Sequence, residues 1–155
     1  MESKNIEMEN LWNNYLISIN ENPQKSKLVC KSVDYFGEEH IADTLFELIY
    51  KGEKTAGCGC LWSNEEELFE KGDLSIVTNL AGSKGCIIET QKITIKKFLE
   101  ITKEEAKLEG EGDLSLEYWR KAHKEFFQKE GKEQGKIFNE EMLVIFEEFK
   151  VVYKE

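Results

Sequence analysis

Apolar residues recur at helical intervals near the start of the chain and again after residue 38. Residues 5–20 predict an amphipathic helix that ends before Pro23. In the second stretch the apolar residues share one helix face, and Gly52 follows where a C-terminal cap is expected. The positions on this face are Ile41, Leu45, Leu48 and Ile49. Residues 27–36, between the two predicted helices, suit a short strand.

Two later stretches are rich in β-branched residues and predict strands. Residues 74–95 contain two such runs around a glycine-containing loop at 81–85, which is the pattern of a β-hairpin. Residues 143–153 form a further predicted strand whose pattern allows a bulge. These runs add three strands to the strand expected at 27–36.

Short helices separate the hairpin from the last predicted strand. Thr102 and Glu105 fit a capping box at the start of a helix that continues to Leu108. Residues 109–113 then force a loop, and Ser115 caps another helix. One face of that helix carries Leu116, Trp119, His123 and Phe126 or Phe127. Strands interleaved with helices, without regular βαβ alternation, predict an α+β protein built around a small antiparallel barrel or sheet.

Length and charge narrow the classes of protein and ligand. A chain of 155 residues suits one domain. We therefore expect residues 1–155 to form a single unit, with the helix at about 5–21 packed on a barrel at about 27–153. A formal charge of −10 disfavours a long polyphosphate and favours a small or weakly charged ligand, although a local basic groove remains compatible with it.

The absence of a long apolar run predicts a cytoplasmic protein without membrane contact. In a reducing compartment the cysteines are expected to be free thiols. These are Cys30, Cys58, Cys60 and Cys86.

Residues 51–62, KGEKTAGCGCLW, invite three interpretations. Cys58 and Cys60 are too close for the C-x₂-C spacing of zinc sites, and His40 and His123 stand alone, so we expect no metal and no cofactor. The glycines and lysine are in the wrong order for a phosphate-binding Walker loop. The remaining interpretation is a pocket wall, in which Gly57 lets a ligand approach the backbone closely. A solvated lysine followed by a strand curved by its glycines is the alternative.

An acidic, glycine-spaced segment offers a second candidate wall. Glu109, Glu111 and Asp113 alternate with glycines, and such crowding is expected to raise the pKa of at least one carboxyl group, as a general acid requires. A solvated acidic loop is the alternative. Likewise, His123 fits either a catalytic residue or a hydrogen-bonded residue at the edge of the core, and Trp119 either a base-stacking surface or the core.

Several motifs together resemble those of bacterial ASCH-domain proteins of about this length. They are G-x-K-T-A at 52–56, G-D-L-S-I-V at 72–77, C-I-I-E-T at 86–90, E-G-E-G-D-L-S-L-E-Y-W-R-K-A-H-K-E-F-F at 109–127 and F-K-V-V-Y at 149–153. The resemblance extends from about Trp12 to Tyr153. It implies a PUA-like small β-barrel with flanking helices, and a cleft between barrel and helices that binds RNA, a nucleotide or a nucleoside.

The resemblance also implies a candidate activity. Smaller relatives are amidohydrolases that remove an acyl group from N4-acetylcytidine with a lysine, a threonine and a glutamate, and another relative is a ribonuclease. The lysine falls on Lys54 and the glutamate on Glu109, but the threonine position is Gly57, which has no hydroxyl. Three hypotheses therefore remain. The first is a binding protein for RNA, a nucleotide or a modified nucleoside, and the second is a hydrolase that uses Lys54 and Glu109. A surface for a protein partner is the third.

In the binding hypothesis, Lys54 contacts a phosphate or carbonyl oxygen and Glu109 pairs with a base amino group. We expect these two side chains to face each other across a cavity wide enough for a nucleobase. The full set of candidate ligand-binding residues is Tyr35, Lys54, Thr55, Gly57, Cys58, Glu109, Glu111, Asp113, Trp119 and His123.

Overall fold

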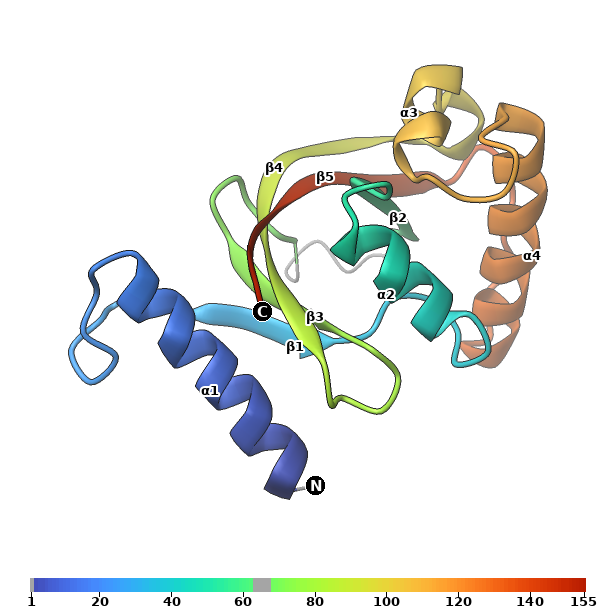
Figure 1. Ribbon diagram of the computed structural model, residues 1–155. Coiled ribbons are helices and arrows are strands. Elements are labelled where there is room, and N and C mark those ends of the chain that lie inside the picture. The colour runs from blue at the N-terminus through green and yellow to red at the C-terminus, as the bar shows by residue number, and fades with distance from the viewer. Residues whose placement is uncertain (1, 63–67) are drawn as a thin grey trace.

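A computed structural model describes residues 2–62 and 68–155 of the chain. Its centre is a five-stranded sheet with the strand order β1-β3-β4-β5-β2 (Figure 1). The strands are β1 (Cys30–Asp34), β2 (Ala56–Cys60), β3 (Leu74–Thr78), β4 (Gly85–Lys97) and β5 (Leu143–Lys154). Strands β1 and β3 pair in parallel and the other neighbours are antiparallel. The predicted α+β class is confirmed, but the sheet is mixed and open, with β1 and β2 at its edges.

The helices agree with the local sequence signals in part: the helix expected at 5–20 lies at 2–18, and the short helix at 98–100 is not predicted by any sequence pattern. They are α1 (Glu2–Ser18), α2 (Ala42–Tyr50), the short 3₁₀ helix η2 (Phe98–Glu100), α3 (Lys103–Leu108) and α4 (Leu116–Glu133). Thr102 and Glu105 form the expected capping box, and the Ser115 hydroxyl accepts a hydrogen bond from the Tyr118 N–H. None of these helices is long and apolar enough to cross a bilayer.

Helices α1 and α4 are held at opposite ends of the sheet by two apolar clusters (Figure 1), and a third cluster packs Phe46 and Ile49 of α2 on the strands. Near β3, α1 buries Met8, Leu11, Tyr15 and Leu16 against Leu74, Ile76 and Ile87. At the other end, α4 buries Trp119 and Phe127 with Phe98, Val144 and Phe146. Helix α4 is thereby placed beside the edge strand β2, where the candidate residues lie.

Strand β2 carries glycines at two alternate positions beside β5, so one face of the sheet lacks side chains there. Gly57 pairs with Glu147, and Gly59 pairs with Ile145. Because alternate residues of a strand point to the same face, the two glycines leave one face of β2 without side chains. The predicted hairpin is present in β3 and β4, and the β4–β5 ladder contains register shifts, as the expected bulge requires.

Candidate functional site

A cavity of about 880 Å³ lies along β2, between the segment before α2, the sheet and α4. Its volume falls in the range of small-molecule sites. Most of its lining is apolar or lacks a side chain: Phe36, Gly37, Ile41, Leu45, Gly57, Cys58, Gly59, Cys60, Leu68, Phe69, Ile93, Ala122, Phe126 and Ile145. Lys54, Glu109 and Glu111 meet where β2 begins and the α3–α4 turn approaches it, and they form the polar end of the cavity. Further charged side chains of the lining are Glu38, Glu125, Lys129 and Glu147.

Lys54 is the centre of that polar end. It is 2% exposed, and its Nζ lies 3.3 Å from Glu109 Oε1, 3.4 Å from the Glu109 carbonyl oxygen and 2.9 Å from Glu111 Oε2. An ammonium group has three N–H donors, so these three oxygens match all of them. The arrangement therefore leaves Lys54 no donor for another partner.

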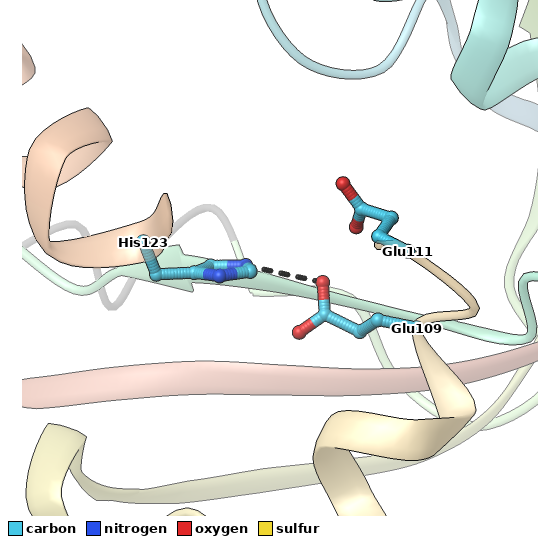
Figure 2. Close-up of side chains that lie close together, drawn as sticks. All are labelled: Glu109, Glu111 and His123. Atoms are coloured by element: carbon cyan, nitrogen blue, oxygen red, sulfur yellow. Dashed lines mark hydrogen bonds and ion pairs between the residues drawn. The ribbon is translucent and has the colours of Figure 1, made fainter. Parts of the chain in front are cut away.

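Glu109 is 1% exposed and accepts hydrogen bonds on both carboxylate oxygens. Oε1 accepts from Lys54 and lies 3.1 Å from His123 Nε2, as Figure 2 shows, while Oε2 accepts from Trp119 Nε1. Burial raises the pKa of Glu109, but Lys54, His123 and Trp119 lower it by more, to about 2. The expectation that crowding raises a carboxyl pKa is wrong for Glu109, because the charge of Lys54 and the interactions with His123 and Trp119 outweigh the effect of burial.

Helix α4 aligns the two aromatic residues that hold Glu109. The His123 ring stacks on Trp119 with 4.1 Å between the ring centroids. His123 Nδ1 lies 2.9 Å from the Trp119 carbonyl oxygen, one helical turn earlier, so both ring nitrogens face oxygen acceptors. Trp119 is 3% exposed and belongs to the core. It therefore supports Glu109 and offers no stacking surface.

The other two acidic residues of the segment differ from each other. Glu111 lines the cavity, and its side chain is 22% exposed. Asp113 is exposed, accepts a hydrogen bond from the Ser115 N–H, and has a lowered pKa because of hydrogen bonding with Ser115. Asp113 thus serves the start of α4 and does not line the cavity.

The structure separates the predicted site residues into two groups. The cavity is lined by Lys54, Gly57, Cys58, Glu109, Glu111 and His123, whereas Tyr35, Thr55, Asp113 and Trp119 do not line it. The Thr55 hydroxyl donates instead to the Leu108 carbonyl oxygen, 3.3 Å away. Lys54 and Glu109 do not face each other across the cavity: they form a direct ion pair at one end of it.

The cysteines are free thiols, as expected. Burial raises the pKa of Cys58 well above its ordinary value, and the Glu109 charge raises it further. The positive charge of Lys54 acts in the opposite direction but is outweighed. Cys58 is therefore a neutral thiol in the cavity wall, with no activated nucleophile at this position.

Sequence reasoning missed several lining residues, among them Phe36, Phe69, Phe126 and Glu147. Tyr35 was a predicted ligand-binding residue, but its neighbour Phe36 lines the cavity instead. Glu147 accepts a hydrogen bond from the Thr90 hydroxyl at 2.6 Å, and burial raises its pKa. The alternation of β5 places Glu147 on the face of Ile145, which is the one sequence signal that could have indicated it.

A metal site would draw on the same cluster. Glu109, Glu111 and His123 offer ligand atoms that all lie within 4.8 Å of one another (Figure 2). The ammonium of Lys54, however, already bridges the two carboxylates, and its charge repels a second cation. The donor set therefore fits an ion-pair network better than a metal centre.

Comparisons with known proteins agree with this architecture. The sequence model of the ASCH domain matches residues 32–153. The structure of an ASCH domain from Lactobacillus crispatus JV V101 is similar with a TM-score of 0.84, at 36% identity over 99% of this chain and 96% of that one. Protein EF3133 from Enterococcus faecalis V583 is similar with a TM-score of 0.82, at 27% identity over 96% and 94% of the two chains.

A more distant likeness concerns the fold alone. The hypothetical protein PH0355 gives a TM-score of 0.51, at 18% identity over 78% of this chain and 98% of that one. No functionally curated protein matches the sequence significantly. The family match covers most of the chain. The sequence of the Lactobacillus protein is 36% identical over 99% of this chain. The chain therefore belongs to the ASCH domain family.

Proposed function

We propose that the protein binds a nucleoside or modified nucleoside, free or as an exposed base of RNA, in the cavity beside β2. The observation that carries the proposal is a cavity of about 880 Å³ with phenylalanine rings in its walls and a hydrogen-bonding network at one end. A nucleobase needs both, because its faces are apolar and its edge carries donors and acceptors. The nucleotide and RNA binding implied by the resemblance to ASCH-domain proteins points in the same direction.

The charges of the lining favour the nucleoside over a phosphorylated ligand. Five carboxylates line the cavity: Glu38, Glu109, Glu111, Glu125 and Glu147. The two lining lysines are already paired, Lys54 with Glu109 and Glu111, and Lys129 with Glu38. A phosphate group would meet repulsion without an unpaired lysine among the described lining residues.

Hydrolysis of an N4-acylated cytidine, or weak ribonuclease activity, has less support. Gly57 has no hydroxyl, and a Cβ built there would lie 3.1 Å from Phe36 Cε2, so Phe36 limits what this position can hold. Glu109, with a pKa of about 2, is a weak proton acceptor. Lys54 donates its three protons to oxygens and has no lone pair for a general base.

A variant that fills the cavity tests the proposal. A Cβ at Gly59 would have no atom within 4 Å, and Gly59 does not have a positive φ, so Gly59→Leu adds a side chain at a lining position without backbone strain. We expect calorimetric titration to show nucleoside binding by the wild type, and roughly tenfold or more weaker binding by Gly59→Leu.

Thr55→Val is the matched control, because the Thr55 hydroxyl faces Leu108 outside the cavity lining. It should bind as the wild type does, and thermal unfolding should show that all three proteins are folded. The absence of binding heat with any nucleoside, or equal affinities for wild type and Gly59→Leu, would refute the proposal.

A further inference from the structure

Two carboxylates contact Lys54, but only one of them has an oxygen left for a ligand. Glu109 is almost completely buried, and both of its oxygens accept hydrogen bonds from protein groups. Glu111 uses only Oε2, and its Oε1 has no hydrogen-bond partner among the described residues. The Glu111 side chain lines the cavity and is 22% exposed. A hydrogen-bond donor of a ligand can therefore reach Glu111 Oε1 without breaking the hydrogen bond between Lys54 and Glu111 Oε2.

The backbone around Glu111 is fixed by close contacts on both sides. Gly110 and Gly112 have φ values of 69° and 60°, a region that favours glycine. A Cβ at Gly110 would collide with the Glu53 carbonyl, and a Cβ at Gly112 would collide with the Tyr118 ring. The turn therefore packs directly on these two residues, and the Glu111 carboxylate is presented from a rigid support.

Lys54 fixes the position of this carboxylate. Its Nζ donates to Glu111 Oε2 at 2.9 Å while it is held from behind by Glu109. Figure 2 shows the Glu111 carboxylate beside the Glu109–His123 pair, with no interaction drawn between Glu111 and either of these two residues. Glu109, His123 and Trp119 thus position Lys54, and Lys54 in turn positions Glu111.

Building on the proposed nucleoside binding, we propose that Glu111, and not Glu109, contacts the ligand, and that Glu111 Oε1 accepts a hydrogen bond from an exocyclic amino group of the base. An ionised carboxylate only accepts hydrogen bonds. A keto oxygen in the place of the amino group would face a negatively charged oxygen without a proton between them. The site therefore selects the amino member of an amino–keto pair of bases that have the same size.

Titration calorimetry with two such pairs tests this selectivity. Cytidine is compared with uridine, and adenosine with inosine, each in the wild type, Glu111→Gln, Glu109→Gln and Glu117→Gln. We expect the wild type to bind the amino member roughly tenfold or more tightly. Glu111→Gln should reduce the preference to about unity, because an amide can donate to a keto oxygen as well as accept from an amine.

The other variants distinguish contact from support. Glu109→Gln should keep the amino preference whatever its effect on affinity, since a positioning residue does not touch the base. Glu117 is exposed on α4 and does not line the cavity, so Glu117→Gln is the matched loss of one carboxylate and should change neither affinity nor preference. Glu111→Asp keeps the charge but shortens the side chain, and should weaken binding of the amino member.

Each result bears on one of the two proposals. Equal binding of amino and keto nucleosides by the wild type, or an unchanged preference in Glu111→Gln, would overturn the role of Glu111 while nucleoside binding stands. Binding of none of the four nucleosides by the wild type would overturn the proposed function, and the role of Glu111 with it.

Discussion

At the scale of single residues, Glu109 is the most constrained group of the site. Its charge is balanced by Lys54 and by hydrogen bonds from buried groups, since almost none of it reaches water. Removing one partner of such a pair leaves the other charge buried without compensation, which is costly. The stability of the protein should therefore depend on the ionisation of this one carboxyl group.

Acid unfolding tests that dependence. The pKa of Glu109 is lowered from 4.5 to about 2, so its ionised form contributes stability above pH 4.5 that is lost as the pH falls towards 2. The contribution is roughly 3 kcal/mol at most. We expect the free energy of unfolding in urea to fall more steeply between these pH values in the wild type than in Glu109→Gln. Glu117→Gln, at an exposed position of α4, is the control. Parallel curves for wild type and Glu109→Gln would contradict the expectation.

At the scale of elements, the sequence predicts what depends on neighbours along the chain. The cap at Ser115, the capping box at Thr102 and the turn at Gly52 are formed as expected, because each requires residues only a few positions apart. The parallel pairing of β1 with β3 was not predicted. Strand pairing depends on contacts between distant segments, and the alternation within one strand does not specify its neighbour.

In the candidate site, too, the sequence indicates individual residues but not the contacts between distant segments. The sequence indicates Lys54 and Glu109 through local motifs, yet their direct contact depends on how the α3–α4 turn packs beside the end of α2. Tyr35 was predicted and Phe36 lines the cavity, because residues at the end of a short strand do not keep a strict alternation. The apolar side chains that line the cavity come from separate parts of the chain, so no local sequence pattern predicts that they lie together.

The glycine-spaced turn between α3 and α4 carries a prediction of its own. Gly110→Ala combines a positive φ with a collision against Glu53, whereas Gly52→Ala has a similar φ of 80° but no atom within 4 Å of the added Cβ. We expect Gly52→Ala to lower the free energy of unfolding by about 1 kcal/mol and Gly110→Ala by about 2 kcal/mol or more. Urea unfolding measures both.

Ligand affinity distinguishes these two glycines further. Gly110→Ala should also weaken nucleoside binding, because it shifts Glu111 away from Lys54, while Gly52→Ala should not. Equal losses in the free energy of unfolding for the two variants would show that the close contact between Gly110 and the Glu53 carbonyl has no effect on stability.

At the scale of the whole molecule, the site is separated from the part of the core that α1 completes. Helices α1 and α4 lie at opposite ends of the sheet (Figure 1). The cavity is lined in part by α4 and by no residue of the cluster around Leu11 and Ile76. No described residue of α1 lines the cavity. The strands connect the two ends, so substitutions in the α1 cluster should change stability more than ligand binding.

The overall charge determines how the protein responds to a phosphate on its ligand. The net charge is −10, and both lysines of the cavity lining are paired with glutamates. We expect cytidine 5′-monophosphate to bind more weakly than cytidine at about 50 mM salt. Because salt screens the repulsion, the difference should shrink at about 200 mM. Cytidine itself carries no charge, so its affinity should not change with salt and serves as the control. Tighter binding of the monophosphate, weakened by salt, would instead reveal a local basic groove and would identify nucleotides or RNA as the ligand class.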